Sequence, residues 1–121
     1  MDTLFDWDAI EAKTVIPGFH GKVVHSNSMT FVLWEIDAGA KLPEHQHVHE
    51  QVAHVLEGQF DVVVAGQAAS LHAGMVAVVP SNARHSAVAI TKCRILDAFY
   101  PIREDYRDGL TSGVISGAAS K

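Results

Sequence analysis

Three histidines alternate along one short segment of the chain, and a fourth lies far away in the sequence. His45, His47 and His49 are followed by Gln51, while His85 belongs to a later segment. Imidazole nitrogens and amide oxygens are donors that divalent transition metals accept in proteins. We therefore predict a metal site formed by His45, His47, Gln51 and His85.

Strand geometry explains how these groups can meet. Alternate residues of a strand share one face, so His45 and His47 can both point into a barrel interior. Gln51 has the same parity and would enter from the adjacent strand, and His85 would begin a further strand. His49 also has this parity, so His47 with His49 is a rival pair of ligands.

The predicted ligand set carries no negative charge. Three neutral imidazoles and one amide leave the +2 charge of a divalent ion uncompensated, so the ion should act as a Lewis acid and favour an anionic ligand. An amide oxygen is a weaker ligand than a carboxylate, so Gln51 would bind loosely or only hold a water. Zinc, nickel, manganese and iron all fit this nitrogen and oxygen set.

A second group with chemical potential lies near the end of the last predicted strand. Asp97 interrupts an apolar run and shares a strand face with Phe99. A buried carboxyl tends to have a raised pKa, which a general acid or base near neutral pH requires. Arg103, just beyond the strand, could bind a substrate carboxylate in bidentate fashion. A purely structural ion pair between Asp97 and Arg103 is the alternative.

The middle of the chain consists of short runs rich in β-branched and aromatic residues, separated by turn signals that contain Gly, Pro or Asn. Many short strands with regular turns predict a closed barrel or a two-sheet jelly roll. One helical turn is predicted over residues 6–11, with Asp6 as its N-cap. The predicted strands span residues 29–36, 52–56, 60–64, 75–79, 85–90 and 93–100.

Composition and charge narrow the class of protein. With 121 residues, of which 48% are hydrophobic, the chain is long enough for one domain and too short for two. The formal net charge is -5 and the nine Lys and Arg residues are scattered, which argues against nucleic acid as a partner. The apolar run at residues 75–79 is too short to span a membrane, and the acidic amino terminus lacks the features of a signal peptide. We expect a soluble cytoplasmic protein.

The remaining histidines and the cysteine have no such context. The single Cys93 cannot form an internal disulfide and is expected in the core, where free cysteines are common. The other four histidines are expected on the surface or as hydrogen-bonded core residues; they are His20, His25, His54 and His72.

Two spacings resemble the motifs of the cupin family. The pattern Gly39-x5-His45-x-His47-x3-Gln51-x6-Gly58 resembles the first cupin motif, and Gly74-x5-Pro80-x-Asn82-x2-His85 resembles the second. The positions of Gly39 and Gly58 in the first motif favour His45 and His47 as ligands over His47 and His49. The resemblance implies an all-β fold: a single-domain, RmlC-like cupin, which is a double-stranded β-helix or jelly-roll barrel.

Three positions depart from the cupin pattern. Gln51 stands where the commonest cupin ligand is Glu, Asn82 replaces a Gly, and Ala89 stands where an Asn is frequent. Asn tolerates a left-handed backbone better than other non-glycine residues, so Asn82 can replace the Gly in a turn without changing the chemistry of the site. Only the first departure changes the predicted chemistry.

Residues 45–106 are similar to the small single-domain cupins of the KdgF type, the pectin-degradation proteins. The matching blocks are His45-Gln-His-Val-His-Glu-Gln51, Val55-Leu-Glu-Gly58, Val79-Pro80 before His85, and Leu96-Asp97-x-Phe99-x-Pro101-x-Arg103-Glu104-Asp105. The resemblance implies ring opening and tautomerisation of 4,5-unsaturated uronate monosaccharides to linear keto sugars. It also implies that His45, His47, Gln51 and His85 hold one divalent metal ion, that Asp97 and Arg103 act in catalysis, and that Phe99 and Arg103 bind the small anionic sugar.

Two other functions stay open: a metal-dependent cupin dioxygenase, and a non-catalytic module that holds a small acid or sugar. By analogy with single-barrel cupins we expect a homodimer in which an amino-terminal strand, at residues 15–16 or 19–24, joins the partner's sheet. The domain should span residues 1–106 with a barrel core at about 20–103. The small and polar tail, 107–121, should be flexible.

Overall fold

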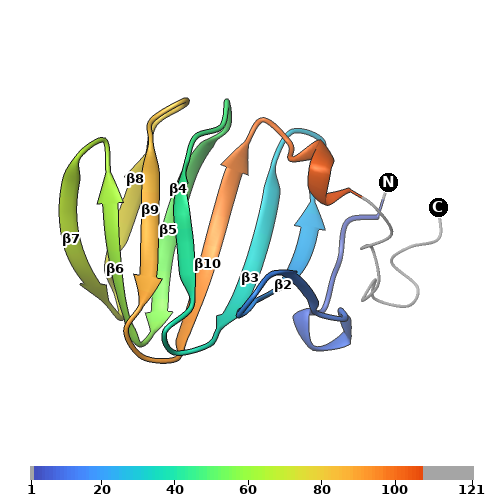
Figure 1. The fold of residues 1–121 in the computed structure, drawn as a ribbon. Helices are drawn as coiled ribbons and strands as arrows, with labels where there is room; N and C mark the ends of the chain where they lie inside the picture. The colour runs from blue at the N-terminus through green and yellow to red at the C-terminus, as the bar shows by residue number, and fades with distance from the viewer. Residues whose placement is uncertain (1, 108–121) are drawn as a thin grey trace.

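The computed structural model describes residues 2–107, and ten strands form two antiparallel sheets in this range (Figure 1). Short 3-10 helices at Trp7–Ala9 and Glu104–Tyr106 flank the strands. The strands are β1 (Lys13–Ile16), β2 (Phe19–His25), β3 (Thr30–Ile36), β4 (Lys41–His45), β5 (Glu50–Glu57), β6 (Gln59–Val64), β7 (Gln67–His72), β8 (Val76–Val79), β9 (His85–Ala89) and β10 (Cys93–Tyr100).

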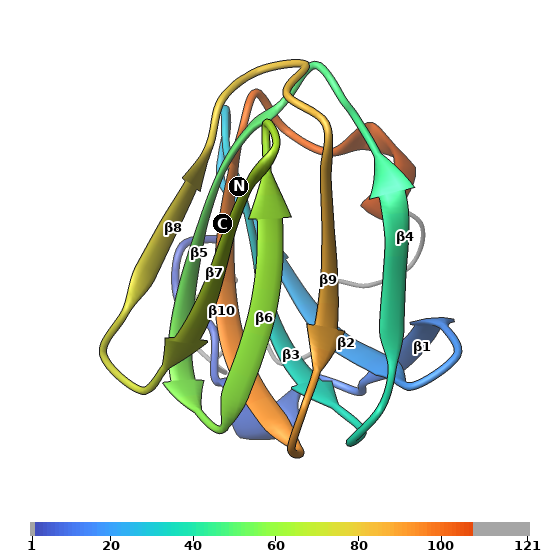
Figure 2. The same ribbon diagram turned by 60° about the vertical axis from the view of Figure 1, so that its left-hand side comes forward.

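The two sheets face each other as the layers of a jelly-roll barrel. One has six strands in the order β1-β2-β3-β10-β5-β8, and the other has four in the order β4-β9-β6-β7. Figure 2 shows the four-stranded sheet in front of the six-stranded one, with long connections crossing between them at the upper end. The all-β jelly-roll fold predicted from the sequence is therefore confirmed.

All six predicted strands are present, and the helical turn is the 3-10 helix at Trp7–Ala9, where the Asp6 carboxylate accepts a hydrogen bond from the Asp8 N–H. The pattern of apolar residues did not predict β4 or β7, and a strand at His45 was expected only from the spacing of the histidines. β4 contains Pro43 and lies at a sheet edge, and β7 has small residues with only Leu71 buried. Edge strands bury too little for a clear alternating pattern.

Inward-facing residues of the six-stranded sheet line up in rows, because cross-strand partners share a face. One row runs through Val23, Val32, Asp97 and Ala53, so the acid sits among buried aliphatic side chains. The next row lies two residues nearer to the upper end of the barrel. It runs through His25, Thr30, Phe99, Gln51 and Val79, and we call it the mouth row.

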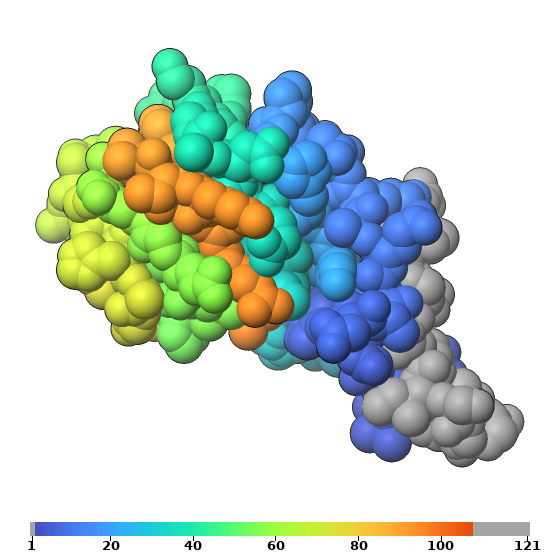
Figure 3. Space-filling view, turned by 90° about the horizontal axis from the view of Figure 1, so that it is seen from below, coloured from blue at the N-terminus to red at the C-terminus, as the bar shows by residue number. Residues whose placement is uncertain are grey.

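The end opposite the mouth row is closed by turns. Gly58 has φ +90, and a Cβ at this position would lie against the Lys92 carbonyl oxygen. The neighbouring Gln59 N–H donates to Thr91 Oγ1 at 3.0 Å, which holds the β5–β6 turn against the β9–β10 turn. Figure 3 shows this end, where teal, green and orange segments pack against one another.

Several smaller predictions can be compared with the structure. Asn82 has φ +63, so it occupies the left-handed turn position expected of it, and Cys93 is buried with its Sγ 3.1 Å from the Gln59 carbonyl oxygen. None of the helices in residues 2–107 is long and apolar enough to cross a membrane. The cytoplasmic compartment stays a prediction.

The segments that were expected to join a partner's sheet form β1 and β2, and β1 is an edge strand of the six-stranded sheet. β1 pairs with β2 in antiparallel fashion, with Lys13 opposite Gly21 and Thr14 opposite His20. The homodimer itself stays a prediction. Apart from Arg107, the tail predicted at 107–121 lies outside the described residues.

Candidate metal centre and the acid beside it

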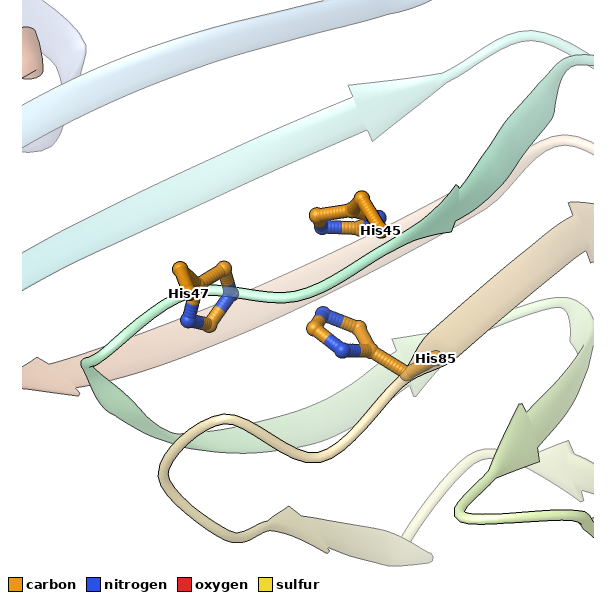
Figure 4. A group of neighbouring side chains, drawn as sticks. All are labelled: His45, His47 and His85. Atoms are coloured by element: carbon orange, nitrogen blue, oxygen red, sulfur yellow. The ribbon is translucent and has the colours of Figure 1, made fainter.

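Three histidine side chains converge at the open end of the barrel (Figure 4). His45 is the last residue of β4 and His85 is the first of β9, and the two are direct cross-strand partners. Their ring centroids are 4.1 Å apart, and the His47 ring lies 4.8 Å from that of His85. One nitrogen from each ring lies within 4.8 Å of the others, so the cluster could hold a metal ion.

The route by which His47 reaches the cluster differs from the prediction. It was expected on the same strand as His45, but β4 ends at His45 and His47 lies in the connection to β5. Asn82 N–H donates to the His47 carbonyl oxygen at 2.8 Å, which fixes this connection against the β8–β9 turn. The turn that carries the left-handed Asn82 therefore helps to place a candidate ligand.

Backbone carbonyls set the tautomer of all three rings. Nδ1 of His45 lies 2.9 Å from the Pro43 carbonyl oxygen, and Nδ1 of His85 lies 2.9 Å from that of Ala83. Nδ1 of His47 makes the same contact with the His49 carbonyl oxygen. A carbonyl oxygen only accepts, so each Nδ1 carries the proton and each Nε2 keeps its lone pair.

The free lone pairs match what a metal ion needs. Nε2 of His85 is buried and has no hydrogen-bond partner among the described residues, an arrangement that a bound cation would satisfy. Burial and the nearby Arg103 charge lower the pKa of His47 to about 4, and burial also lowers the pKa of His85. Both rings therefore stay neutral near pH 7, as metal ligation requires.

Gln51 comes from the opposite sheet and completes this group. It is the second residue of β5, only 8% exposed, and its Oε1 lies 3.2 Å from Nε2 of His47. With the proton on Nδ1, both of these atoms are acceptors, so either the amide is flipped or a cation belongs between them. The structure brings all four predicted ligands together, and ligation by Gln51 stays a prediction.

His49 lies outside the three-histidine group. Its carbonyl oxygen orients His47, and its ring packs near Phe99 with centroids 6.5 Å apart. Of the two alternative pairs of ligands, the structure therefore brings together His45 and His47, with His85 as the third member of the cluster. The other histidines fit their prediction: His20 and His25 have hydrogen-bond partners, and His54 and His72 are exposed.

Asp97 is a buried carboxyl in an apolar row, 6% exposed. Trp34 Nε1–H donates to its Oδ2 at 2.9 Å, while Oδ1 has no hydrogen-bond partner among the described residues. Burial raises the pKa of Asp97 to about 6, against the opposing effects of the Gln51 amide, the Trp34 indole and the Arg103 charge. Such a carboxyl can give or take a proton near neutral pH.

Arg103 forms its ion pair with Asp105, whereas the alternative considered above paired it with Asp97. Nε donates to Oδ1 at 3.0 Å and Nη2 donates to Oδ2 at 2.7 Å. The guanidinium carbon lies 4.7 Å from the Phe99 ring centroid and 4.2 Å from that of Tyr106. Asp105 occupies the Nε edge of the fork, which leaves the Nη1 edge for a second carboxylate.

The three-histidine cluster, Gln51, Asp97 and Arg103 border one cavity of about 350 Å³. The wall deeper in the barrel is apolar, with Phe19, Ile36 and Phe60 among its residues. Its polar lining includes the three histidines, Gln51, Asp97 and Arg103, which lie near the mouth row. Glu44 and Ser86 also line the cavity. A metal ion, a proton-transfer group and an anion-binding group can therefore reach the same small molecule.

Sequence patterns missed three residues that shape this cavity. Trp34, Asp105 and Tyr106 hold Asp97 and Arg103 in place, and no role was assigned to them from the sequence. The signal for Asp105 was available, because an acid two residues from Arg103 can pair with it. Nothing local to Trp34 indicates that its partner is Asp97, which is 63 positions away in the chain.

The fold and this site define a small jelly-roll protein with a three-histidine cluster that could hold a metal ion. Residues 32–99, more than half of the chain, match the cupin domain family. The chain therefore belongs to the cupin family, as its two motifs predicted.

Two KdgF proteins and an RmlC-like cupin are similar to this chain over most of its length. The pectin degradation protein KdgF of Dickeya dadantii (strain 3937) is 30% identical over 86 residues, which cover 69% of this chain and 78% of that protein. The structure of KdgF from Halomonas sp. is similar with a TM-score of 0.81 and 32% identity, covering 85% of this chain and 98% of that one. An RmlC-like cupin from Shewanella frigidimarina NCIMB 400 has a TM-score of 0.82 and 32% identity, with coverage of 86% and 96%.

Cupins of other activity share the fold. Salicylate 1,2-dioxygenase from Pseudoaminobacter salicylatoxidans is similar with a TM-score of 0.68 and 24% identity, over 72% of this chain and 26% of that one. Likeness at this level concerns the fold alone.

Proposed function

We propose that this cupin is a metal-dependent isomerase that opens 4,5-unsaturated uronate monosaccharides and tautomerises them to linear keto sugars. The observation that supports this most directly is the placement of the three-histidine cluster, buried Asp97 and Arg103 around one cavity. Identity of 30–32% with KdgF proteins supports the choice of a uronate. The proposed metal ligands are His45, His47, Gln51 and His85.

Arg103 and Phe99 would hold the substrate. The guanidinium has its Nε edge on Asp105, so the Nη1 edge can accept a uronate carboxylate in bidentate fashion. Phe99 presents a ring beside both His47 and Arg103, where it can pack against a sugar face. These contacts would fix the ring oxygen near the histidine cluster.

Asp97 would move protons. Opening a cyclic hemiacetal removes the proton of the anomeric hydroxyl as the bond between C1 and the ring oxygen breaks, and the resulting enolate gains a proton at C4 to become the ketone. The substrate and product are isomers, so one group can take the first proton and return the second. A carboxyl with a pKa of about 6 and one unpartnered oxygen suits both transfers. A divalent ion bound at the histidine cluster would supply Lewis-acid polarisation of the substrate oxygen.

The decisive experiment incubates the metal-loaded protein with an unsaturated uronate and follows the loss of the alkene absorbance. We expect turnover by the wild-type protein, and turnover reduced by at least about a hundredfold in His85→Ala and in Asp97→Asn, as for loss of a metal ligand or a general base. His54→Ala, an exposed histidine outside the cavity, is the control. Equal rates in wild-type protein and His85→Ala would refute the proposal.

Two other experimental outcomes would support one of the alternative functions. Binding of the uronate without any loss of absorbance would indicate a non-catalytic binding module. Oxygen consumption with candidate thiols or phenols would indicate a dioxygenase. Metal analysis of the purified protein, in the same preparation, identifies which of zinc, nickel, manganese or iron is bound.

A further inference from the structure

A chain of hydrogen bonds at the open end joins the six-stranded sheet to the segment that carries Arg103. Arg103 N–H donates to Thr30 Oγ1 at 2.8 Å. Thr30 Oγ1 lies 2.8 Å from Nδ1 of His25, and Nε2 of His25 lies 3.2 Å from the Tyr106 carbonyl oxygen. None of these contacts was assigned a role in the site described above.

One atom determines the direction of every hydrogen bond in this series. The Tyr106 carbonyl oxygen can only accept, so Nε2 of His25 carries the proton. In a neutral ring Nδ1 is then an acceptor, and it receives the Thr30 hydroxyl proton. The Thr30 oxygen in turn accepts from Arg103 N–H, so each donor has one acceptor.

Thr30 is placed for this task by the sheet. It is fully buried, and within the mouth row it lies opposite His25 on β2 and opposite Phe99 on β10. Residues 101–107 belong to no strand. The hydrogen-bond chain therefore ties both ends of the Arg103–Tyr106 segment to the sheet.

The position of that segment determines where the guanidinium of Arg103 lies. Its carbon lies 4.7 Å from the centroid of Phe99, which is fixed on β10, and 4.2 Å from that of Tyr106, which moves with the segment. The Tyr106 ring also meets the Trp34 ring at a centroid distance of 6.4 Å. A shift of the backbone at Arg103 or Tyr106 would open this stack, and displacements of about 1 Å are costly to substrate positioning.

We propose that Thr30 and His25 are positioning residues that hold Arg103 in the geometry needed to bind the carboxylate of an anionic substrate. This inference rests on the proposed uronate isomerase function for its kinetic readout. The carboxylate keeps its charge throughout the reaction, so we expect that loss of positioning acts mainly on KM and less on kcat.

The kinetic test compares Thr30→Val with Thr30→Ser on the unsaturated uronate, using metal-loaded protein. Val keeps the shape and removes the hydroxyl, so we expect KM to rise about tenfold with kcat within about twofold of wild type. Ser keeps the hydroxyl and should restore KM. His25→Phe leaves the Thr30 oxygen in place for Arg103 N–H, so its KM should be intermediate.

Thr14→Val is the matched control. Thr14 Oγ1 lies 2.8 Å from Nδ1 of His20, the same kind of contact at the other end of β2, and neither residue borders the cavity. We expect this variant to keep the wild-type KM. A tenfold rise in KM with Thr14→Val would show that any lost Thr–His contact perturbs the barrel, and would overturn the proposal.

A second readout needs no turnover. The Arg103 Nε–H is bonded to Asp105, so it should give a separate signal in a proton–nitrogen NMR spectrum of the wild-type protein, identified by its loss in Arg103→Lys. Thr30→Val should broaden or shift this signal, while zinc binding by the histidine cluster, measured by calorimetry, stays unchanged. An unchanged Arg103 signal in Thr30→Val overturns the positioning role. Absence of turnover in wild-type protein would refute only the proposed function.

Discussion

Trp34 and Asp97 meet inside the barrel through a hydrogen bond of 2.9 Å from the indole Nε1–H to Oδ2. They lie on adjacent strands, β3 and β10, in neighbouring rows: Trp34 is opposite Ile95, and Asp97 is opposite Val32. The indole is a neutral donor to this carboxylate, and the Gln51 amide and the Arg103 charge also favour its ionised form. The contact therefore sets how readily Asp97 ionises.

Trp34→Phe tests this contact. We expect the free energy of unfolding to fall at pH 7.5 by about 1–3 kcal/mol more than at pH 4.5, because the lost bond is strongest to the ionised carboxylate. The loss of packing is equal at both pH values, so the difference isolates the hydrogen bond. Urea unfolding of metal-free protein measures it.

Trp7→Phe is the control for this substitution. Trp7 lies in the amino-terminal 3-10 helix, and it is its backbone carbonyl that accepts from Lys22 Nζ, so the exchange of the ring leaves that bond in place. The effect of Trp7→Phe should not depend on pH. An equal loss of stability for Trp34→Phe at the two pH values would contradict the role given to the indole.

Asp97→Asn should remove one contribution to the pH dependence of the free energy of unfolding. Burial raises the folded-state pKa of Asp97 from 3.8 to about 6, so the unfolded chain gives up this proton at lower pH than the folded protein does. Ionisation of Asp97 therefore removes stability as the pH rises from about 4 to about 6, by about 3 kcal/mol for two units.

The measurement compares wild-type protein and Asp97→Asn by urea unfolding in the presence of a chelator between pH 4 and pH 8. Both proteins contain the same histidines, so their titration cancels in the difference. Asp97→Asn should gain stability relative to wild type as the pH rises to about 6, with no further gain above it. A difference that does not change with pH would show that the Asp97 pKa is not raised.

Gly21 makes room for the indole. An added Cβ would lie 2.8 Å from Cζ3 and 3.0 Å from Cε3 of Trp34, so Gly21→Ala must displace the ring. We expect a loss of about 1–3 kcal/mol in the free energy of unfolding, as for other overpacked sites. In Gly21→Ala combined with Trp34→Phe the smaller ring should relieve the clash, so the double variant should lose less than the sum. Strict additivity of the two losses would contradict this account.

Strand positions and the two-sheet fold could be predicted because they depend on local signals: alternation of apolar residues and turns that contain Gly, Pro or Asn. The placement of His45 and His85 in one site was predicted from motif spacing, and the structure adds that they are cross-strand partners. Asn82 was predictable for the same reason, since its left-handed backbone is a property of one residue.

The contacts that tune the site could not be predicted in the same way. Trp34 and Asp97 are distant in sequence, and the register that brings β3 beside β10 is fixed by the whole barrel. His47 was placed on a strand because its parity fits, whereas the chain leaves β4 after His45. Parity holds only while the backbone stays extended, and a short polar segment does not show where a strand ends.

Gln51→Glu tests whether the amide is a metal ligand. A carboxylate is a stronger ligand for a divalent ion than an amide oxygen and supplies the negative charge that this ligand set lacks, so zinc affinity should rise about tenfold or more. Without metal the new carboxylate would lie beside Asp97 and destabilise the protein, so zinc should raise the Tm of Gln51→Glu more than that of wild type. Gln67→Glu, on the exposed edge strand β7, is the matched control and should leave zinc affinity unchanged. Equal zinc affinity for wild-type protein and Gln51→Glu would remove Gln51 from the ligand set and leave a site of three histidines.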